Sequence, residues 1–173
     1  MKKIVLVMSW RFPMTHSKRG KLTYFSEKLS NTLNNKTQTT SKRNKSVIKT
    51  RKIHTIRLNY DRWKHNIDKI KKGGYQLSVR EWENAPYRSK QRRVLDTENV
   101  DYQRITMSFD PEEGVRAVID GKRMTDIDLL AKNDGLTKKE FIEWFFGENP
   151  TEKKLITGII IHFTDFKYEV SRE

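Results

Sequence analysis

Short apolar runs separated by polar turn residues recur along most of this chain. In several runs apolar and polar residues alternate, which is typical of strands with one buried face, and the last run is almost continuously apolar. The pattern predicts strands at residues 4–8, 53–58, 75–80, 92–96, 103–109, 115–119, 122–124 and 155–163. Asp120-Gly121 predicts a two-residue hairpin turn between the sixth and seventh of these runs.

Helical spacing of apolar residues appears in two longer segments. One helix is predicted from Leu22, because four apolar side chains fall on one side of it: Leu22, Phe25, Leu29 and Leu33. Asn59 is a favoured N-cap residue and predicts a second helix that Gly73-Gly74 ends. The apolar stripe of this second helix is Tyr60, Trp63, Ile67 and Ile70.

Two shorter helices are predicted nearer the C-terminus from capping-box spacing. Thr125 and Asp128 predict a helix that ends near Gly135. Thr137 and Glu140 predict another that ends at Gly147, with the aromatic residues at 141, 144 and 145 facing the core. Because strands outnumber helices and no regular strand–helix–strand alternation is present, we expect an α+β fold, a small β-barrel with peripheral helices.

The chain length of 173 residues fits one domain, residues 1–173. Residues 34–47 are polar and lack apolar anchors, so we expect a mobile basic loop there. Thirty-six Lys and Arg against 22 Asp and Glu give a net charge of +14, which favours an anionic partner, although a basic protein also gains solubility from such a charge. No cysteine is present, which excludes disulfides, thiolate metal sites and cysteine nucleophiles.

The N-terminal apolar run at residues 4–8 is too short for the hydrophobic region of a signal peptide, and we expect a buried strand there. No stretch approaches the roughly 20 apolar residues that span a bilayer. We therefore expect no membrane partner and a cytoplasmic location. Walker-type, dinucleotide-binding, GxSxG and HExxH motifs are missing, and the four histidines are scattered, so we expect no metal site and no cofactor.

Two clusters of basic, aromatic and small polar residues carry candidate chemistry. The first is Arg51 to Arg57, in which strand geometry puts Thr55 and Arg57 on one face and His54 and Ile56 on the other. Lys52 would lie with His54 in a continuous strand, and it approaches Thr55 only if residues 50–53 form a turn or bulge. These residue types bind phosphate, sugar or base edges in nucleic-acid complexes.

The second cluster runs from Ser78 to Arg93. Ser78, Arg80 and Trp82 share a strand face, so a guanidinium beside an indole is available to bind phosphate and stack on a base. The following loop adds Tyr87, Arg88, Ser89 and Lys90. The alternatives are that Trp82 belongs to the core with Arg80 as its ion-paired neighbour, and that the loop is simply solvated.

These segments resemble the ASCH domain family, which adopts a PUA-like β-barrel. The resemblance is carried by Lys52-Ile53-His54-Thr55-Ile56-Arg57, by residues 74–82 and by Pro86-Tyr87-Arg88-Ser89-Lys90-Gln91. A pattern of Phe12-Pro13, His16, Gly20, Thr23 and Phe25, and Asn133-Asp134-Gly135 with the helix after it, are similar to a bacterial and phage subgroup. The resemblance covers most of the chain except residues 34–47.

The resemblance implies RNA or nucleotide binding in a cleft of the barrel, with His16 among the candidate binding residues. One type of ASCH protein is an amidohydrolase that removes the acetyl group of N4-acetylcytidine, and its catalytic lysine and threonine match Lys52 and Thr55. Its glutamate has no counterpart here, and Asp134 is the available substitute.

Three hypotheses follow. The first is an RNA- or nucleotide-binding domain that uses both clusters: Lys52, His54, Thr55, Arg57, Arg80, Trp82, Tyr87, Arg88, Ser89 and Lys90. The second is an amidohydrolase acting on N4-acylated cytidine-type nucleosides through Lys52, Thr55 and Asp134. The third is a basic adaptor that docks on an acidic protein. The most informative observation for the first two is spatial: whether Lys52, Thr55, Arg80 and Asp134 converge on one cavity.

Overall fold

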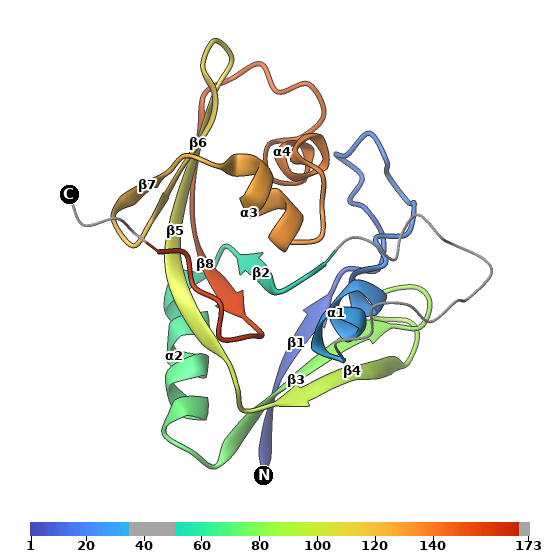
Figure 1. Cartoon of the computed structure of the whole chain (residues 1–173). Coiled ribbons are helices and arrows are strands. Elements are labelled where there is room, and N and C mark those ends of the chain that lie inside the picture. The colour runs from blue at the N-terminus through green and yellow to red at the C-terminus, as the bar shows by residue number, and fades with distance from the viewer. Residues whose placement is uncertain (35–50, 170–173) are drawn as a thin grey trace.

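The computed structural model describes residues 1–34 and 51–169, which form an α+β fold. The described strands form two sheets (Figure 1). The three-stranded sheet has the order β1 (Lys2–Met8), β3 (Tyr75–Trp82), β4 (Gln91–Thr97). The five-stranded sheet has the order β2 (His54–Arg57), β8 (Lys154–His162), β5 (Asp101–Asp110), β6 (Gly114–Ile119), β7 (Lys122–Met124).

Four helices in the described ranges pack around these sheets: α1 (Phe25–Leu33), α2 (Tyr60–Lys71), α3 (Ile127–Asn133) and α4 (Lys138–Phe146). Helix α2 packs against β3, β5 and β8, whereas α1 packs against β4 and α3 packs against β6 and α4. Figure 1 shows α1 between the three-stranded sheet and the α3–α4 pair. None of the described helices is both long and apolar enough to cross a membrane.

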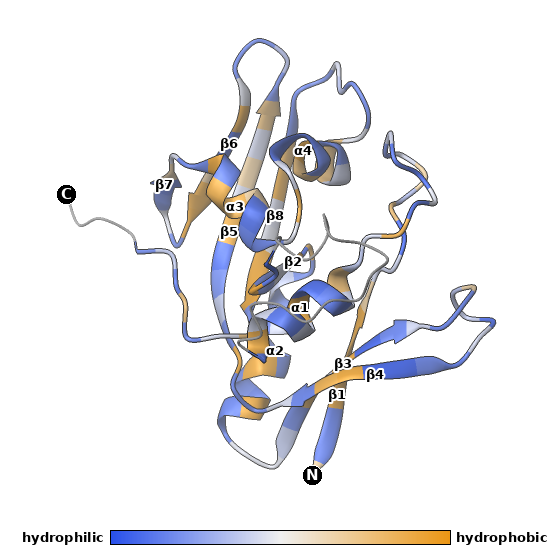
Figure 2. Cartoon of the chain, turned by 45° about the vertical axis from the view of Figure 1, so that its right-hand side comes forward, coloured by the Kyte–Doolittle hydropathy of each residue, from blue (hydrophilic) through white to orange (hydrophobic). Residues whose placement is uncertain are grey.

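The expected α+β class is confirmed, but the described strands do not close into one barrel. β1 and β3 pair in parallel, with α1, β2 and α2 between them in sequence, while the pairs of the five-stranded sheet are all antiparallel. The core between the sheets and helices contains fully buried aliphatic side chains, including Leu6, Leu77, Val79, Ile105 and Ile159. The hydropathy colouring follows this arrangement, since the outer ends of β3 and β4 are hydrophilic (Figure 2).

Several local predictions are confirmed by backbone geometry. Asn59 caps α2 by accepting a hydrogen bond from the Arg62 amide, and Thr137 and Glu140 form a complete capping box at α4. Asp120 and Gly121 both have positive φ, 49° and 83°, as a type I′ hairpin between β6 and β7 requires. The expected loop at 34–47 lies, beyond its first residue, outside the described residues.

Three predictions are wrong. Helix α1 begins at Phe25, because Leu22 forms an isolated bridge with Arg11 and Tyr24 has φ 56°. Asp126 rather than Thr125 caps α3, because its carboxylate accepts a hydrogen bond from the Leu129 amide at 2.8 Å. β2 is not half-buried.

The burial of β2 has a structural cause. His54, Thr55 and Ile56 are all buried, although β2 is an edge strand in its sheet. On its free side the Arg57 guanidinium donates to the Val7 backbone oxygen in β1 at 2.6 Å. On its paired side a Cβ at Gly158 of β8 would lie only 2.5 Å from the Arg57 oxygen. β2 therefore lies between β8 of its own sheet and β1 of the other. Both of its faces are covered as well, since His54 packs on Tyr168 and Thr55 lines a cavity with Phe25 and Trp144, so alternation of exposure is lost.

Candidate functional site

Lys52 lies just before β2, where the chain leaves the β-ladder. The Ile53 amide donates to the Asn133 oxygen at 2.9 Å, and the Lys52 amide contacts the Thr32 hydroxyl at 3.2 Å. The turn or bulge expected to bring Lys52 towards Thr55 is not found at residues 51–53, and the Ile53 oxygen still accepts from the Phe163 amide at 2.9 Å. The Lys52 side chain is fully buried, and its ammonium lies 4.1 Å from the centre of the Phe25 ring.

The Lys52 ammonium binds the C-terminal end of α3. Its Nζ donates to the Asp134 carboxylate at 2.6 Å and to the Asp134 backbone oxygen at 2.7 Å. A cation at this end is favoured by the helix dipole and by the unpaired carbonyl groups. Gly135 then turns the chain with φ 82°, and a Cβ there would lie 3.3 Å from both Lys28 Cδ and Lys52 Cβ. A glycine is therefore needed both for backbone conformation and for room.

Burial changes the protonation equilibrium of this pair. Loss of solvation lowers the pKa of Lys52, and Asp134 opposes that change. Loss of solvation raises the pKa of Asp134, and Lys52 and Arg57 oppose it. Each group is favoured in its charged form by its partner and in its neutral form by burial. The free-energy gap between the ion pair and the neutral pair is therefore narrower than in water.

Lys52, Thr55, Arg57 and Asp134 line one small cavity of about 20 Å³. Met8, Ser9 and Ile56 complete its polar and aliphatic walls, and Phe25 and Trp144 give aromatic ones. A volume of this size holds roughly one water molecule. Thus three of the four residues expected to converge do so, and Thr55 and Arg57 reach the same cavity from one strand.

Arg57 is the least satisfied polar group in this wall. One terminal nitrogen donates to Val7, but Nε is buried and has no hydrogen-bond partner among the described residues. Burial lowers the pKa of Arg57, and Asp134 opposes that shift. A buried donor without a partner is energetically unfavourable and marks a position where a ligand acceptor would be stabilised.

Lys28 is a buried cation that the sequence analysis did not single out. Its Nζ donates to the Gly135 oxygen at 2.7 Å, so two lysines bind the chain just after α3. Burial lowers the pKa of Lys28 to about 8, and the nearby Lys52 adds to this effect. Its position three residues after Phe25, on the apolar side of α1, was the available signal.

Arg80 and Trp82 lie elsewhere, on the outer face of the three-stranded sheet. Met8, a cavity residue, is paired in register with Glu81, so the inner face of β3 carries Glu81. Glu81 is buried and accepts a hydrogen bond from Ser26 in α1. Because successive strand residues point to opposite faces, Arg80 and Trp82 point away from Lys52. The expectation of one pocket lined by both clusters is therefore corrected.

The second cluster forms an exposed hairpin end. The rings of Trp82 and Tyr87 are 5.3 Å apart, and Tyr87 is 90% exposed with φ 62°. Arg88 and Lys90 are exposed beside them. Ser89 stabilises the turn, since its hydroxyl accepts from the Asn84 amide and donates to the Ala85 oxygen, both at 3.0 Å. Ser89 thus has a structural role, whereas Tyr87, Arg88 and Lys90 face solvent and Trp82 is half-buried.

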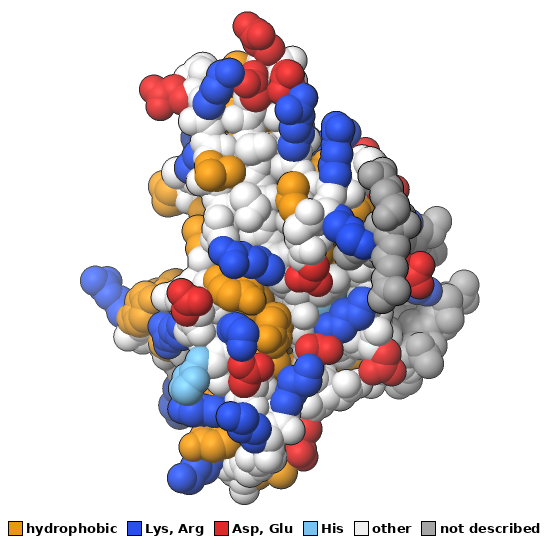
Figure 3. Space-filling model, turned by 90° about the vertical axis from the view of Figure 1, so that its left-hand side faces the viewer, with side chains coloured by type: hydrophobic (Ala, Val, Ile, Leu, Met, Phe, Trp, Pro, Cys, Tyr) orange, Lys and Arg blue, Asp and Glu red, His pale blue; other side chains and the backbone are white. Residues whose placement is uncertain are grey.

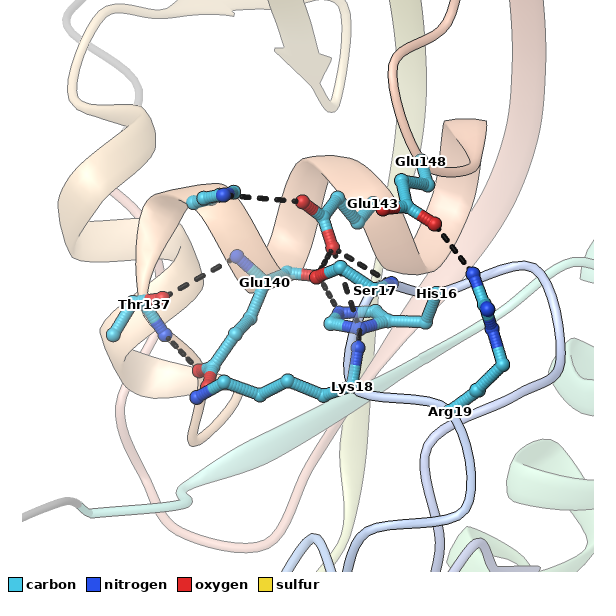
Figure 4. Close-up of polar contacts among 9 residues, drawn as sticks. His16, Ser17, Lys18, Arg19, Thr137, Glu140, Glu143 and Glu148 are labelled. Carbon is cyan, nitrogen blue, oxygen red and sulfur yellow. Dashed lines mark hydrogen bonds and ion pairs between the residues drawn. The ribbon is translucent and has the colours of Figure 1, made fainter.

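His16 belongs to a segment, residues 15–19, that lies on α4 (Figure 4). Its ring is buried, with Nε2 3.1 Å from the Glu140 oxygen and Nδ1 accepting from the Lys18 amide at 2.9 Å. Lys18 pairs with Glu140 at 2.5 Å and Arg19 with Glu148 at 2.6 Å. His16 does not line the cavity but fixes this segment on α4. Its ring and the nearby ring of Phe12 both contact Trp144, which does line the cavity.

His54 also lies outside the cavity, on the opposite face of β2. It is buried, and its Nε2 is 2.7 Å from the hydroxyl of Tyr168. Asp126 and Asp128 both lie at the start of α3. Asp126 caps the helix and Asp128 pairs with Lys138 at 3.2 Å. Within residues 1–34 and 51–169, no three acidic or histidine side chains gather as metal ligands.

Other surfaces are less distinctive. A larger hollow of about 310 Å³ lies at the β5–β6 end, but its charges pair with each other, Arg116 with Glu113 and Lys153 with Asp110, both at 2.7 Å. On the face shown in Figure 3, Lys and Arg side chains are interspersed with Asp and Glu. Elsewhere too, cations have acidic partners, since Lys71 and Lys167 both pair with Asp101. The enclosed Lys52 cavity combines unusual burial with an unsatisfied donor, and we take it as the candidate site.

No protein-family model matches the chain, and the searches of curated proteins and of solved structures return no match.

Proposed function

We propose that this chain binds a nucleotide or RNA as an ASCH-type domain would, and that the cavity around Lys52 receives a polar edge of the ligand. The buried Arg57 guanidinium carries the proposal, because its Nε lacks a partner among the described residues. Phe25 and Trp144, with ring centres 5.4 Å apart, provide apolar faces beside these cations. Phosphate or carbonyl oxygens would satisfy the donors, and a base would pack on the rings.

Ligand entry requires an opening, since the cavity of about 20 Å³ holds only water. The segment at residues 15–19 is held on α4 by the buried His16 ring and by Ser17, whose amide and hydroxyl donate to the buried Glu143 carboxylate, as well as by the more exposed Arg19–Glu148 ion pair. Exposed ion pairs contribute little stability each, but an opening at this segment would also break the buried contacts.

RNA would add contacts at the hairpin end, where Tyr87, Arg88 and Lys90 are exposed and Trp82 and Arg80 are half-buried beside them. Exposed rings stack on bases of any sequence, and neighbouring cations bind the phosphates. Because this surface and the cavity lie on opposite faces of the three-stranded sheet, a single nucleotide does not touch both. We therefore assign the cavity to one nucleotide and the hairpin to a flanking strand.

Binding of a fluorescently labelled 12-nucleotide single-stranded RNA, measured by anisotropy at several salt concentrations, tests this function. About six phosphate contacts give a slope near −4 in a log–log plot against salt. Tyr87→Ala should weaken binding by about 5- to 150-fold, from the loss of one stacking contact. Arg123→Ala, which removes an exposed cation from β7, is the matched control and should have a small effect.

Absence of binding to both the RNA and nucleoside monophosphates at low salt would refute the proposal. Binding of an acidic protein that ignores changes at Trp82 and Tyr87 would favour the adaptor function instead.

Amidohydrolase activity is a second candidate, favoured by a buried lysine of lowered pKa beside a threonine and a carboxylate. In this scheme neutral Lys52 takes the Thr55 hydroxyl proton as the oxygen attacks the acyl carbon of an N4-acylated cytidine. Arg57 stabilises the oxyanion. Lys52 returns the proton to the departing amine as the C–N bond breaks, and water then hydrolyses the acyl-threonine ester, releasing the acid and restoring Thr55.

Incubation with N4-acetylcytidine, followed by chromatography for cytidine and acetate, tests this activity. Thr55→Val keeps the shape of the side chain and should abolish turnover, whereas Thr55→Ser should retain part of it. Turnover that persists in Thr55→Val would remove Thr55 as the nucleophile. No turnover by the unaltered chain, together with nucleotide binding, would leave binding as the sole function.

The PUA-like barrel belongs to the same proposal, with the two sheets as its two halves. The Arg57–Val7 hydrogen bond between β2 and β1 supports it, because it joins the facing edges of the sheets. An experimental structure of the chain with a nucleotide bound tests this. Backbone pairing between the sheets would support the barrel, and two separate sheets would oppose it.

A further inference from the structure

A buried polar chain leads from the carboxylate of Asp134 to the C-terminal segment. His54 Nδ1 lies 3.8 Å from Asp134 Oδ1, and His54 Nε2 lies 2.7 Å from the Tyr168 hydroxyl. The Tyr168 oxygen also accepts a hydrogen bond from the Asn133 side-chain amide at 3.0 Å. These four side chains come from β2, from the last residue and the C-cap of α3, and from the segment after β8, so the tertiary fold brings them together.

The hydrogen bonds define which ring nitrogen of His54 carries the proton. Burial raises the pKa of Tyr168, so its hydroxyl keeps its proton. Because Asn133 already donates to the Tyr168 oxygen, the hydroxyl proton is directed to His54 Nε2. The proton of the neutral ring therefore resides on Nδ1, the atom that faces Asp134.

His54 Nδ1 has no hydrogen-bond partner among the described residues, although the ring is completely buried. A separation of 3.8 Å is too long for a hydrogen bond and too short for an intervening water. A movement of under about 1 Å closes it to bonding distance. A donor buried in this way, aimed at a carboxylate, would be unfavourable unless that carboxylate accepts from it at some stage.

We propose that His54 is a positioning residue for Asp134, which accepts from Nδ1–H of His54 when Lys52 gives up its charge or turns to a ligand. The inference rests on the proposed function only for the role of Asp134 in ligand binding or catalysis; the geometry around His54 does not depend on it. The charged groups that face Asp134 are Lys52, Arg57 and Lys28. His162 lies on the other side of the His54 ring, with ring centres 5.8 Å apart.

The neutral state of His54 supports this role. Burial lowers the pKa of His54 well below its usual value, and His162 and Lys52 add to the effect. Burial also lowers the pKa of His162 to about 4. Both rings are therefore neutral around pH 7, and His54 offers Asp134 a donor without adding a second buried charge.

Long-range proton–nitrogen NMR of the full chain measures the tautomer directly. We expect the Nδ1–H form for His54 at pH 7, and no titration of this ring near pH 6.5. Tyr168→Phe removes the hydroxyl but keeps the ring, and it should increase the Nε2–H form. An Nε2–H tautomer in the unaltered chain, or no change in Tyr168→Phe, would overturn the proposal. Neither measurement requires a ligand.

Two variants then separate positioning from packing. His54→Asn places an amide donor near the position of Nδ1, whereas His54→Gln places it near Nε2. The Asp134 carboxyl pKa, followed by carbon NMR and assigned with Asp134→Asn, should stay close to the unaltered value in His54→Asn and rise by about one unit in His54→Gln. Equal pKa values in the two variants would overturn the proposal.

The activity or affinity of the site should follow the same order, with about a tenfold loss in His54→Gln relative to His54→Asn. If the tautomer and pKa results hold but neither nucleotide nor RNA binds, the proposed function fails and the role of His54 stands. If a ligand binds but His54→Asn and His54→Gln give the same Asp134 pKa, the proposed function stands and the role of His54 fails.

Discussion

The Lys52 cavity and the exposed hairpin end use the same residue types under opposite physical conditions. In the cavity, the Lys52 ammonium and the Arg57 Nε are taken out of water; burial lowers the pKa of Lys52, whose charge Asp134 supports, while the Arg57 guanidinium stays charged but lacks a full set of acceptors. At the hairpin, Tyr87, Arg88 and Lys90 stay in solvent, where a charge requires no partner. Residues in the cavity are therefore constrained by stability as well as function, whereas those of the hairpin are free to serve binding alone.

The largest expected effect is a loss of stability when a charged residue of the cavity is replaced. Lys52→Ala leaves the buried Asp134 carboxylate without its ammonium and should lower the free energy of unfolding by about 3–5 kcal/mol. The double variant Lys52→Met with Asp134→Leu should recover most of this loss, because two apolar side chains fill the site. Urea unfolding measures both. A loss below about 1 kcal/mol in Lys52→Ala would mean that the pair is not desolvated.

Stability should also depend on pH through Lys28, whose pKa burial lowers from 10.5 to about 8. Below pH 8 the folded chain keeps a desolvated charge. Between about pH 8 and 10.5 the unfolded chain binds more protons, so stability rises with pH, by up to about 3 kcal/mol. Lys28→Met removes this dependence, and the difference between the two urea-unfolding series isolates it. A difference that is flat from pH 7 to 10.5 would contradict the burial of Lys28.

Gly→Ala substitutions at two glycines test whether the space around the site is more crowded than an open turn. Gly135 and Gly74 have nearly equal φ values, 82° and 84°, but only Gly135 has neighbours within 4 Å of a Cβ position. Gly135→Ala should therefore lower the free energy of unfolding by about 1–2 kcal/mol more than Gly74→Ala does. Thermal unfolding of both variants measures the difference. Equal losses would show that the wall around Lys28 and Lys52 yields to an added methyl group.

The smallest expected change in stability is at Tyr87. Its positive φ is unfavourable for a residue with a side chain, and the ring is almost fully exposed. Tyr87→Gly should leave the free energy of unfolding unchanged or raise it by up to about 1 kcal/mol, while weakening RNA binding as Tyr87→Ala does. Denaturant unfolding and RNA-binding anisotropy on the same sample measure the two effects, unchanged or higher stability and weaker binding. A clear loss of stability would place Tyr87 in the fold rather than in binding.

Local chemistry made much of the fold predictable. Asn59, Asp120-Gly121 and the Thr137–Glu140 box each act through neighbours within a few residues, so their signals are complete in the sequence. The meeting of Lys52 with Asp134 also agrees with the expectation, although they are far apart in the chain.

The remaining features depend on long-range packing. The alternation of β3 separates Glu81 from Arg80 and Trp82, but only the parallel pairing with β1 and the covering helix α1 determine which face is inside. Likewise, nothing close to His54 in sequence indicates Tyr168, and β2 loses its alternation because both of its faces are covered.

The parallel pairing of β1 with β3 has a consequence for biosynthesis. Residues 2–8 find their register partners at residues 75–81, so β1 is synthesised about 70 residues before its partner and stays unpaired until that later segment emerges. The nascent chain meanwhile carries an apolar, unpaired edge, a feature that attracts chaperones and aggregation. The cavity wall that contains Asp134 and Trp144 is translated later still, so the interior Lys52 finds its counter-ion only after about 80 further residues have been made.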